Sequence, residues 1–135
     1  MLNLKEQLET GNMEVIGKGN YDFIEELFTT DYIAHAGGKV YKGHEFIHRF
    51  IKLLRTAIPD IHVIKIEILA QSGNTVTWQR TLTGTHMADM MGAKATHQNL
   101  RWQDMMVSRF EGNKIAEEWT VSELAGEMLS KYSVS

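Results

Sequence analysis

One aspartate, Asp104, is the strongest candidate for proton-transfer chemistry in this sequence. It lies in a segment, residues 100–110, whose alternating pattern predicts a β-strand with Trp102, Asp104 and Met106 on the same face. The opposite face of that strand carries arginines and is typical of a solvent-exposed surface. We therefore expect Asp104 to point inward. Apolar neighbours disfavour the charged form of a carboxylate, which suits such a group to proton transfer.

Two other arrangements of Asp104 fit the same residues. A shifted register or a bulge would turn its side chain outward. An ion pair with Arg80 or Arg109 would instead give it a structural role, since such pairs also perturb the ionisation of a carboxylate. Each arrangement places the carboxylate in a different environment.

Two histidines, His35 and His86, stand at the ends of predicted strands and are further catalytic candidates. A neutral imidazole donates or accepts a proton near neutral pH, so either could polarise a substrate carbonyl. The simpler interpretation is a histidine hydrogen-bonded to backbone at a turn. His44 and His48 are four residues apart in a predicted helix, a spacing that can hold a metal, but no third ligand is evident. We predict neither a metal site nor an organic cofactor.

Several large side chains are expected to form the walls of a small-molecule pocket. Methionine is flexible and polarizable, which suits irregular apolar ligands, although the same residues would also serve as ordinary core. The residues that we expect to line the pocket are Tyr32, Trp78, Trp102 and Met106.

The last predicted strand, residues 114–121, can face the pocket in two ways. One face carries Glu118 and Thr120, and the other carries Glu117 and Trp119. If the first faces inward, Glu118 is a second possible acid or base and Thr120 lines the pocket. If the second does, Trp119 contacts the ligand. A bulge would allow parts of both, and a surface salt bridge is the alternative role for Glu118.

A glycine-containing turn and a methionine-rich segment lie between two strand patterns. Gly84-Thr85-His86 is followed by Met87, Met90 and Met91. Three thioether side chains exposed to water contribute no stability unless they pack on other apolar groups, so the segment is predicted to form a lid over the pocket.

Composition excludes several classes of function. The 135 residues are 43% hydrophobic, which is enough for one domain, residues 1–135, with a single core. A net charge of −3 without a basic cluster argues against a nucleic-acid partner. There is no cysteine, and no apolar run approaches the ~18 residues that cross a membrane. We therefore expect neither nucleic acid nor membrane as a partner, and a cytoplasmic location.

The hydrophobic period changes from helical to alternating after the only proline, Pro59. Helices are predicted at 2–16, 21–28 and 47–58, with a short one at 123–132. Strands are predicted at 32–35, 62–68, 75–83, 100–110 and 114–121, the last four forming two hairpins around glycine-containing turns. Helices in the first half and antiparallel strands in the second indicate an α+β fold.

Six short motifs occur in an order that resembles the SnoaL-like polyketide (ester) cyclases, of the nuclear-transport-factor-two-like superfamily. The resemblance covers almost the whole chain. It implies a cone-shaped barrel, in which a curved antiparallel sheet wraps around N-terminal helices and encloses a deep apolar pocket. The motifs are Asp31-Tyr32-Ile33-Ala34-His35, Lys42-Gly43-His44-Glu45, Ile58-Pro59-Asp60, Gly84-Thr85-His86, Ala95-Thr96 and Gly112-Asn113-Lys114-Ile115-Ala116-Glu117-Glu118-Trp119.

The resemblance also implies a reaction, an intramolecular aldol ring closure without metal or cofactor. The family's acid/base aspartate aligns with Thr120 and its assisting histidine with Met106. Neither residue transfers protons, because threonine has no accessible pKa and methionine has no proton to offer. The resemblance therefore implies the fold more strongly than the reaction.

Three functions fit these observations. The first is a cofactor-independent cyclase or isomerase acting on a small, largely apolar carbonyl compound. The second is a non-catalytic ligand-binding or scaffolding module. The third is epoxide hydrolysis, which needs two carboxylates beside an arginine. We also expect a homodimer joined through the outer face of the sheet, where Met105, Val107 and Trp119 would leave an apolar strip.

Overall fold

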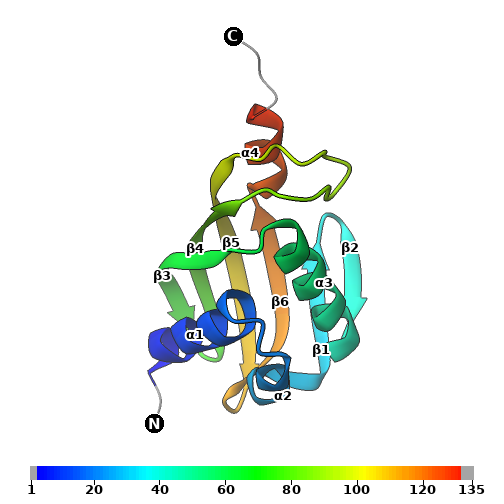
Figure 1. The fold of residues 1–135 in the computed structure, drawn as a ribbon. Helices are drawn as coiled ribbons and strands as arrows, with labels where there is room; N and C mark the ends of the chain where they lie inside the picture. The colour runs from blue at the N-terminus through cyan, green and yellow to red at the C-terminus, as the bar shows by residue number, and fades with distance from the viewer. Residues whose placement is uncertain (1–2, 132–135) are drawn as a thin grey trace.

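The computed structural model describes residues 3–131 as N-terminal helices packed on one face of a curved sheet (Figure 1). The helical elements are α1 (Leu4–Asn12), a π-helical turn (Met13–Gly17), a 3₁₀ turn (Tyr21–Phe23), α2 (Ile24–Leu27), α3 (Gly43–Ala57) and α4 (Leu124–Ser130). The strands are β1 (Phe28–Ala36), β2 (Lys39–Lys42), β3 (His62–Ser72), β4 (Thr75–Thr85), β5 (Asn99–Glu111) and β6 (Lys114–Ser122). The outermost residues of the predicted helices 2–16 and 123–132, residues 2 and 132, lie outside the described part.

The six strands form one sheet in the order β2-β1-β6-β5-β4-β3. This confirms the α+β class and the curved sheet, with two differences. The sheet is mixed, because β1 runs parallel to β6 while the other neighbours are antiparallel. It also stays open, with β2 and β3 as its edges. A hairpin fixes the antiparallel direction of consecutive strands, whereas the long connection between β1 and β6 allows a parallel pair.

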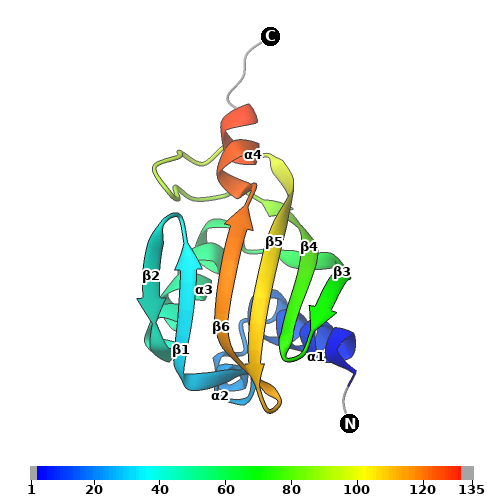
Figure 2. The same cartoon turned by 180° about the vertical axis from the view of Figure 1, so that it is seen from behind.

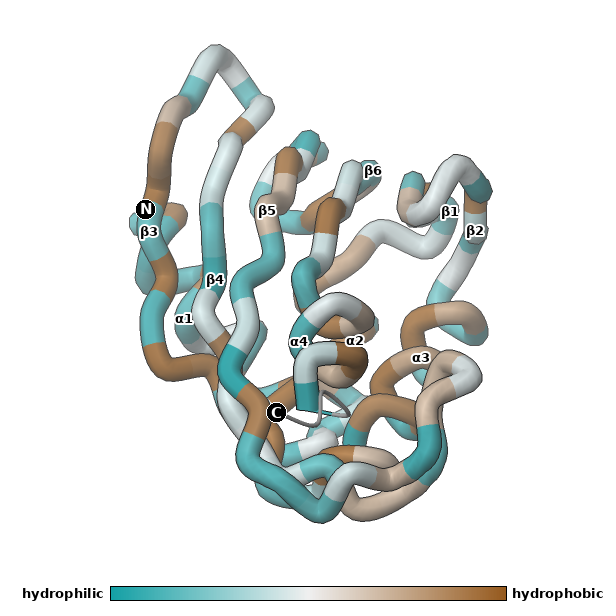
Figure 3. The backbone as a smooth tube through the Cα atoms, turned by 90° about the horizontal axis from the view of Figure 1, so that it is seen from above, coloured by the Kyte–Doolittle hydropathy of each residue, from teal (hydrophilic) through white to brown (hydrophobic). Residues whose placement is uncertain are grey.

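The helices cover only one face of this sheet. Seen from behind, β3 to β6 present their other face without a covering helix (Figure 2). Seen from above, the strands form a curved row with the helices on one side (Figure 3). The long helix α3 packs through Ile47, Ile51 and Leu54, whose spacing places them on one stripe. It ends at Ala57, and its C-cap Ile58 stands directly before Pro59, where the sequence predicts the end of the helix.

The first strand is longer than its sequence predicts. A helix was expected to reach Phe28 and a break to follow, but β1 begins at Phe28 and contains Thr29 and Thr30. β-branched threonines favour this extended conformation. Strand pairing holds the residues on both sides of them, because Phe28 pairs with β6 and residues 33–36 pair with β2 and β6. His44 on α3 also donates a hydrogen bond to the carbonyl oxygen of Thr29 at 2.8 Å. Tertiary contacts therefore override the local helical pattern.

None of the helices in residues 3–131 is both long and apolar enough to cross a membrane.

Gly84 lets β4 pass close to the segment that follows α3. A Cβ atom at this position would collide with Ile58 Cγ2 and lie 3.1 Å from the backbone Cα of Ile61. Asp60 in the same segment accepts hydrogen bonds from the backbone N–H and hydroxyl of Thr85. The Gly84-Thr85 pair thus fastens the end of β4 to the end of α3.

Replacing Gly84 by alanine is therefore expected to destabilise the fold by about 1–3 kcal/mol, the range for overpacking a filled site. Gly126, in α4, is the matched control, because a Cβ atom there would have no neighbour within 4 Å. Gly126→Ala should instead be neutral or stabilising by up to ~1 kcal/mol through helix propensity. Urea unfolding of both variants makes the comparison, and equal effects would contradict the close approach at Gly84.

Candidate functional site

A cavity of about 160 Å³ lies between the helices and the concave face of the sheet. Most of its walls are apolar and buried, whereas Phe50 and Ser122 line it and remain exposed, which marks the side on which it opens. The residues that line it are Leu8, Gly11, Asn12, Val15, Ile16, Leu27, Phe28, Tyr32, Ala34, Ala36, Phe46, Ile47, Phe50, Ile51, Leu54, Trp78, Arg80, Leu82, Trp102, Asp104, Met106, Ile115, Glu118, Thr120, Ser122 and Leu124.

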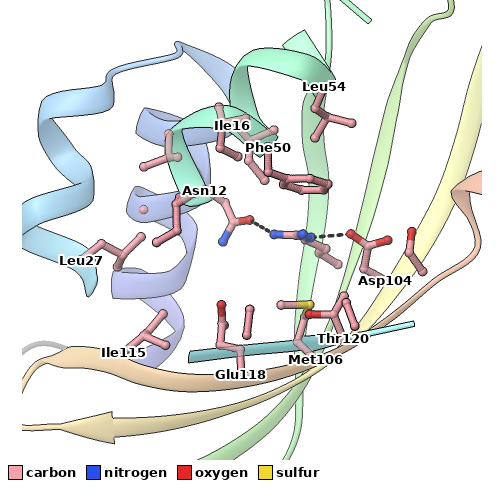
Figure 4. A pocket seen from close by; sticks show the side chains of 18 of the residues that line it. Asn12, Ile16, Leu27, Phe50, Leu54, Asp104, Met106, Ile115, Glu118 and Thr120 are labelled. Carbon is pink, nitrogen blue, oxygen red and sulfur yellow. Dashed lines mark hydrogen bonds and ion pairs between the residues drawn. The ribbon is translucent and has the colours of Figure 1, made fainter. Parts of the chain in front are cut away.

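An ion pair, Arg80–Asp104, crosses this cavity (Figure 4). The two residues are direct partners in the β4–β5 register, so both side chains project from the same face of the sheet. Arg80 Nε donates to Asp104 Oδ2 at 2.8 Å, and Arg80 Nη1 donates to Asn12 Oδ1 at 2.8 Å. Asn12 in turn donates to the carbonyl oxygen of Leu8. The pair is thus tied to both the sheet and α1.

Asp104 combines two of the arrangements that its sequence allowed. It points inward beside Trp102 and Met106, and it is also paired with Arg80. Its side chain is 6% exposed, and its second oxygen, Oδ1, is buried without a hydrogen-bond partner among residues 3–131. A buried carboxylate oxygen normally has a partner, because leaving it unsatisfied is costly. Asp104, which lines the cavity, therefore carries one unsatisfied acceptor.

A second carboxylate, Glu118, lies in the same cavity within a buried hydrogen-bond chain. Its Oε1 accepts from the Tyr32 hydroxyl at 2.8 Å and its Oε2 from the Ser108 hydroxyl at 2.5 Å. Ser108 itself accepts from Trp78 Nε1 at 2.8 Å. Burial raises the pKa of Glu118 above its ordinary value, although both hydroxyl donors and Arg80 act against this. Burial and the nearby Glu118 raise the pKa of Tyr32 well above its ordinary value.

A bulge decides which face of β6 lines the cavity. Phe110 pairs with Ile115 but Arg109 pairs with Glu117, so Ala116 is the extra residue. Ile115 before the bulge and Glu118 after it both face inward, although strict alternation would separate them. The sequence allowed such a mixture without choosing it.

Thr120 and Met106 face each other across β6 and β5, and both line the cavity. These are the positions onto which the resemblance placed an acid/base aspartate and its histidine. The two positions are thus inside the cavity and side by side, but they carry a hydroxyl and a thioether. Asp104 lies two residues before Met106 and projects from the same face of β5.

Two of the expected site residues lie on the outer face of the sheet. His35 and Trp119 stack with their ring centroids 4.9 Å apart, and Trp119 is 40% exposed. His35 Nε2 also donates to Glu117 Oε2 at 2.7 Å. Neither His35 nor Trp119 lines the cavity, because both project from the opposite side of their strands. A catalytic role for His35 and a ligand contact for Trp119 stay predictions that these positions do not support.

His86 is completely buried, but it too lies outside the cavity lining. Its Nδ1 accepts from the backbone N–H of Thr96 at 3.3 Å and lies 3.1 Å from Thr96 Oγ1, so the ring fastens the loop of residues 87–98. No residue of that loop lines the cavity, and Met87 and Met91 are exposed. The prediction that the loop forms a lid over the pocket is wrong, because the loop packs beside α4 and the end of α3. A catalytic role for His86 stays a prediction.

Within residues 3–131, no three His, Cys, Asp or Glu side chains gather into a possible metal-binding group. His44, one of the pair with metal-compatible spacing, instead hydrogen-bonds the backbone of β1.

The sequence alone did not single out two side chains that hold the polar groups of the cavity. Ser108 holds Glu118 and Asn12 holds Arg80. Ser108 follows Asp104 and Met106 by steps of two, so strand alternation predicts that it shares their face. Asn12 follows the apolar Leu8 by four residues, which marks a polar side chain on the buried side of a helix.

Glu117 and Glu118 are neighbours with opposite pKa shifts, which gives a test with an internal control. The pKa of Glu117 is lowered from 4.5, mainly by the hydrogen bond from His35 and then that from Arg109, whereas the pKa of Glu118 is raised from 4.5 by burial. The folded state therefore binds the Glu118 proton more tightly than the unfolded state does. It binds the Glu117 proton less tightly.

The free energy of unfolding of the wild-type protein, measured relative to that of Glu118→Gln, should fall as pH rises above 4.5 and passes through the raised pKa of Glu118. Relative to Glu117→Gln, it should fall as pH drops below 4.5 through the lowered pKa of Glu117. Urea unfolding of the three proteins across this range measures both slopes. Slopes of the same sign would contradict the assignment of the two carboxylates to opposite faces.

Comparison with known proteins agrees with this geometry. A family model for SnoaL-like polyketide cyclases matches residues 6–129. The fold is similar to that of a putative polyketide cyclase from Acidithiobacillus ferrooxidans, with a TM-score of 0.83, 23% identity, and coverage of 98% of this chain and 96% of that one. It is also similar to the fold of IdmH, a putative polyketide cyclase from Streptomyces antibioticus, with a TM-score of 0.79 and 22% identity. That comparison covers 98% of this chain and 100% of IdmH.

Among curated proteins, the glycerol kinases of Brucella ovis and Brucella canis match over 99 residues at 26% identity. The match covers 73% of this chain but 18% of each kinase, so the chain spans about a fifth of the length of these relatives. The family model, in contrast, spans nearly all of the chain. The protein is therefore a member of the SnoaL-like polyketide cyclase family.

Proposed function

We propose that the protein is a cofactor-independent acid–base enzyme that acts on a small, largely apolar carbonyl compound, with Asp104 as its acid and base. The observation that carries the proposal is the asymmetry of this carboxylate. Asp104 lines the cavity, and Arg80 binds one of its oxygens, while the other is buried without a partner among residues 3–131. The oxygen that Arg80 does not bind is the one left to take a proton.

The arrangement fits an aldol ring closure. Asp104 Oδ1 takes a proton from the carbon beside a carbonyl group, and the electron pair of that C–H bond forms an enolate. The N–H groups of Arg80 that bind neither Asp104 nor Asn12 stabilise the negative oxygen. The enolate carbon then attacks a second carbonyl group of the same molecule, forming the C–C bond, and Asp104 returns the proton to the resulting alkoxide.

The remaining lining residues would bind and orient the ligand. Trp78, Trp102 and Met106 supply apolar walls, and Thr120 offers a hydroxyl group beside Met106. Tyr32 and Glu118 form a polar corner whose hydrogen bonds are already made to each other and to Ser108. We assign these residues to ligand binding and Asp104 to catalysis.

A non-catalytic binding module is the second candidate. The observation that favours it is the pair Thr120 and Met106, which stand in the cavity where the resemblance expects an aspartate and a histidine. The two functions differ in what Asp104 does after a ligand binds, so proton exchange separates them.

We also propose that two copies associate through the outer face of the sheet, as a homodimer. Within residues 3–131, no helix covers β5 and β6 on that side (Figure 2). The exposed apolar side chains there include Val121, which is 73% exposed, and Trp119 and Met105. An uncovered apolar strip of this kind is typical of an interface between copies.

The enzyme should accelerate exchange of the α-protons of cyclohexanone or acetophenone for deuterium in D₂O, because enolate formation is the first step of the proposed reaction. Asp104→Asn should slow this exchange by at least about a hundredfold, the scale of general acid–base catalysis. Asp31→Asn, at an exposed position of β1, is the matched control. Proton NMR follows the exchange, and no acceleration by the wild-type protein would favour the binding module.

Light scattering should give a mass of twice the 15.4 kDa monomer. Val121→Lys should yield the monomer without loss of folding, because the side chain is exposed in the single chain and a charge would be buried at the interface. Leu53→Lys, at an exposed position on α3, should remain dimeric. A wild-type mass near 15.4 kDa would rule the interface out.

A further inference from the structure

The cavity is the size of one six-membered ring. Its volume of about 160 Å³ is close to the ~150 Å³ of an engineered apolar cavity that binds benzene. One six-membered ring fits within it, and further substituents would extend through the opening beside Phe50 and Ser122. Phe46 and Phe50, whose ring centroids lie 6.0 Å apart, would flank such a substituent.

The polar groups of the cavity specify what the ring must carry. Both oxygens of Glu118 already accept hydrogen bonds, from Tyr32 and Ser108. Among residues 3–131, Asp104 Oδ1 is the carboxylate oxygen of the cavity lining that has no partner, and it is buried in the wall. A ligand satisfies it only by donating a hydrogen bond, since an ionised carboxylate accepts and does not donate. The ligand group is therefore a hydrogen-bond donor, such as an O–H.

The charges of the cavity argue against an anionic ligand. Asp104 and Glu118 stand there with the single guanidinium of Arg80, which already binds Asp104. A carboxylate ligand would lie near two carboxyl groups in an apolar enclosure, where repulsion between like charges is strong. A neutral hydroxyl group meets no such penalty.

We propose that the site binds a neutral compound with a single six-membered ring whose hydroxyl or enol O–H donates to Asp104 Oδ1. This inference rests on the proposed function and deepens it, because an aldol closure produces a hydroxyl group on the newly closed ring. The substrate is then a compound that closes one ring, and the hydroxyl of the product occupies the open acceptor.

The three tryptophans of the chain provide the readout. Trp78 and Trp102 line the cavity, while Trp119 lies on the outer face. In an NMR titration of the full chain, phenol should shift the indole N–H signals of Trp78 and Trp102 and leave that of Trp119 unchanged. Benzoate, which has the same ring but an anionic acceptor group, should shift none of them. Tighter binding of benzoate than of phenol would overturn the proposal without the need for any variant.

Asp104→Asn provides the sharper test, because the amide keeps its oxygen against Arg80 Nε and turns its NH₂ toward the cavity. The open acceptor becomes a donor. Phenol should then bind about tenfold more weakly, and the affinity for toluene should not change. Benzaldehyde, whose carbonyl oxygen accepts a hydrogen bond, should bind about tenfold more tightly. A tenfold change in affinity is the scale of one hydrogen bond to or from such a group. Asp31→Asn should change none of these affinities. Equal effects on phenol and toluene would overturn the proposal.

The binding and exchange experiments fail independently. If Asp104→Asn abolishes proton exchange but leaves the order of the three probes unchanged, the proposed reaction stands and the ligand assignment is wrong. If the order of the probes reverses but the wild-type protein shows no exchange, the ligand assignment stands and the site binds without catalysis.

Discussion

The burial of a charged pair in an apolar cavity is the constraint on which the rest of the site depends. Removing Arg80 and Asp104 from water costs several kcal/mol for each charge, and only their mutual attraction and further hydrogen bonds offset it. The β4–β5 register places the two side chains opposite each other, and Asn12 on α1 satisfies a further N–H of Arg80. Sheet and helix must therefore be correctly docked before the pair is stable.

The two faces of the sheet carry different chemistry, and neighbouring residues show this most clearly. Glu118 faces inward, where burial raises its pKa, while Glu117 faces outward between His35 and Arg109, which lower its pKa. The same alternation separates Thr120 in the cavity from Trp119 on the outer surface. A one-residue change in the phase of β6 would exchange these roles, so the bulge at Ala116 determines the composition of the site.

The spacing of apolar and polar residues along the sequence predicted the features that follow from the period of a strand or a helix. The inward position of Asp104 and the helix ending before Pro59 follow from steps of two and from the stripe of α3. The same spacing could not predict the features that depend on residues far away in the sequence. The phase of β6 depends on the bulge, and the position of His86 depends on its contact with Thr96. The extended conformation of Thr29 and Thr30 depends on the pairing of the residues that flank them and on the hydrogen bond from His44. His35 lies outside the cavity because it alternates along β1 with Ala34 and Ala36, which line it.

The parallel pairing of β1 with β6 has a consequence for the order in which the molecule folds. The hydrogen bond between Tyr32 and Glu118 joins residues 86 positions apart, and closing so long a loop costs entropy before any contact repays it. The hairpins β3–β4 and β5–β6 need only short loops and form sooner by the same argument. β1 therefore docks late, and Glu118 stays hydrated until it does. The wall that completes the cavity is among the last parts of the native state to form.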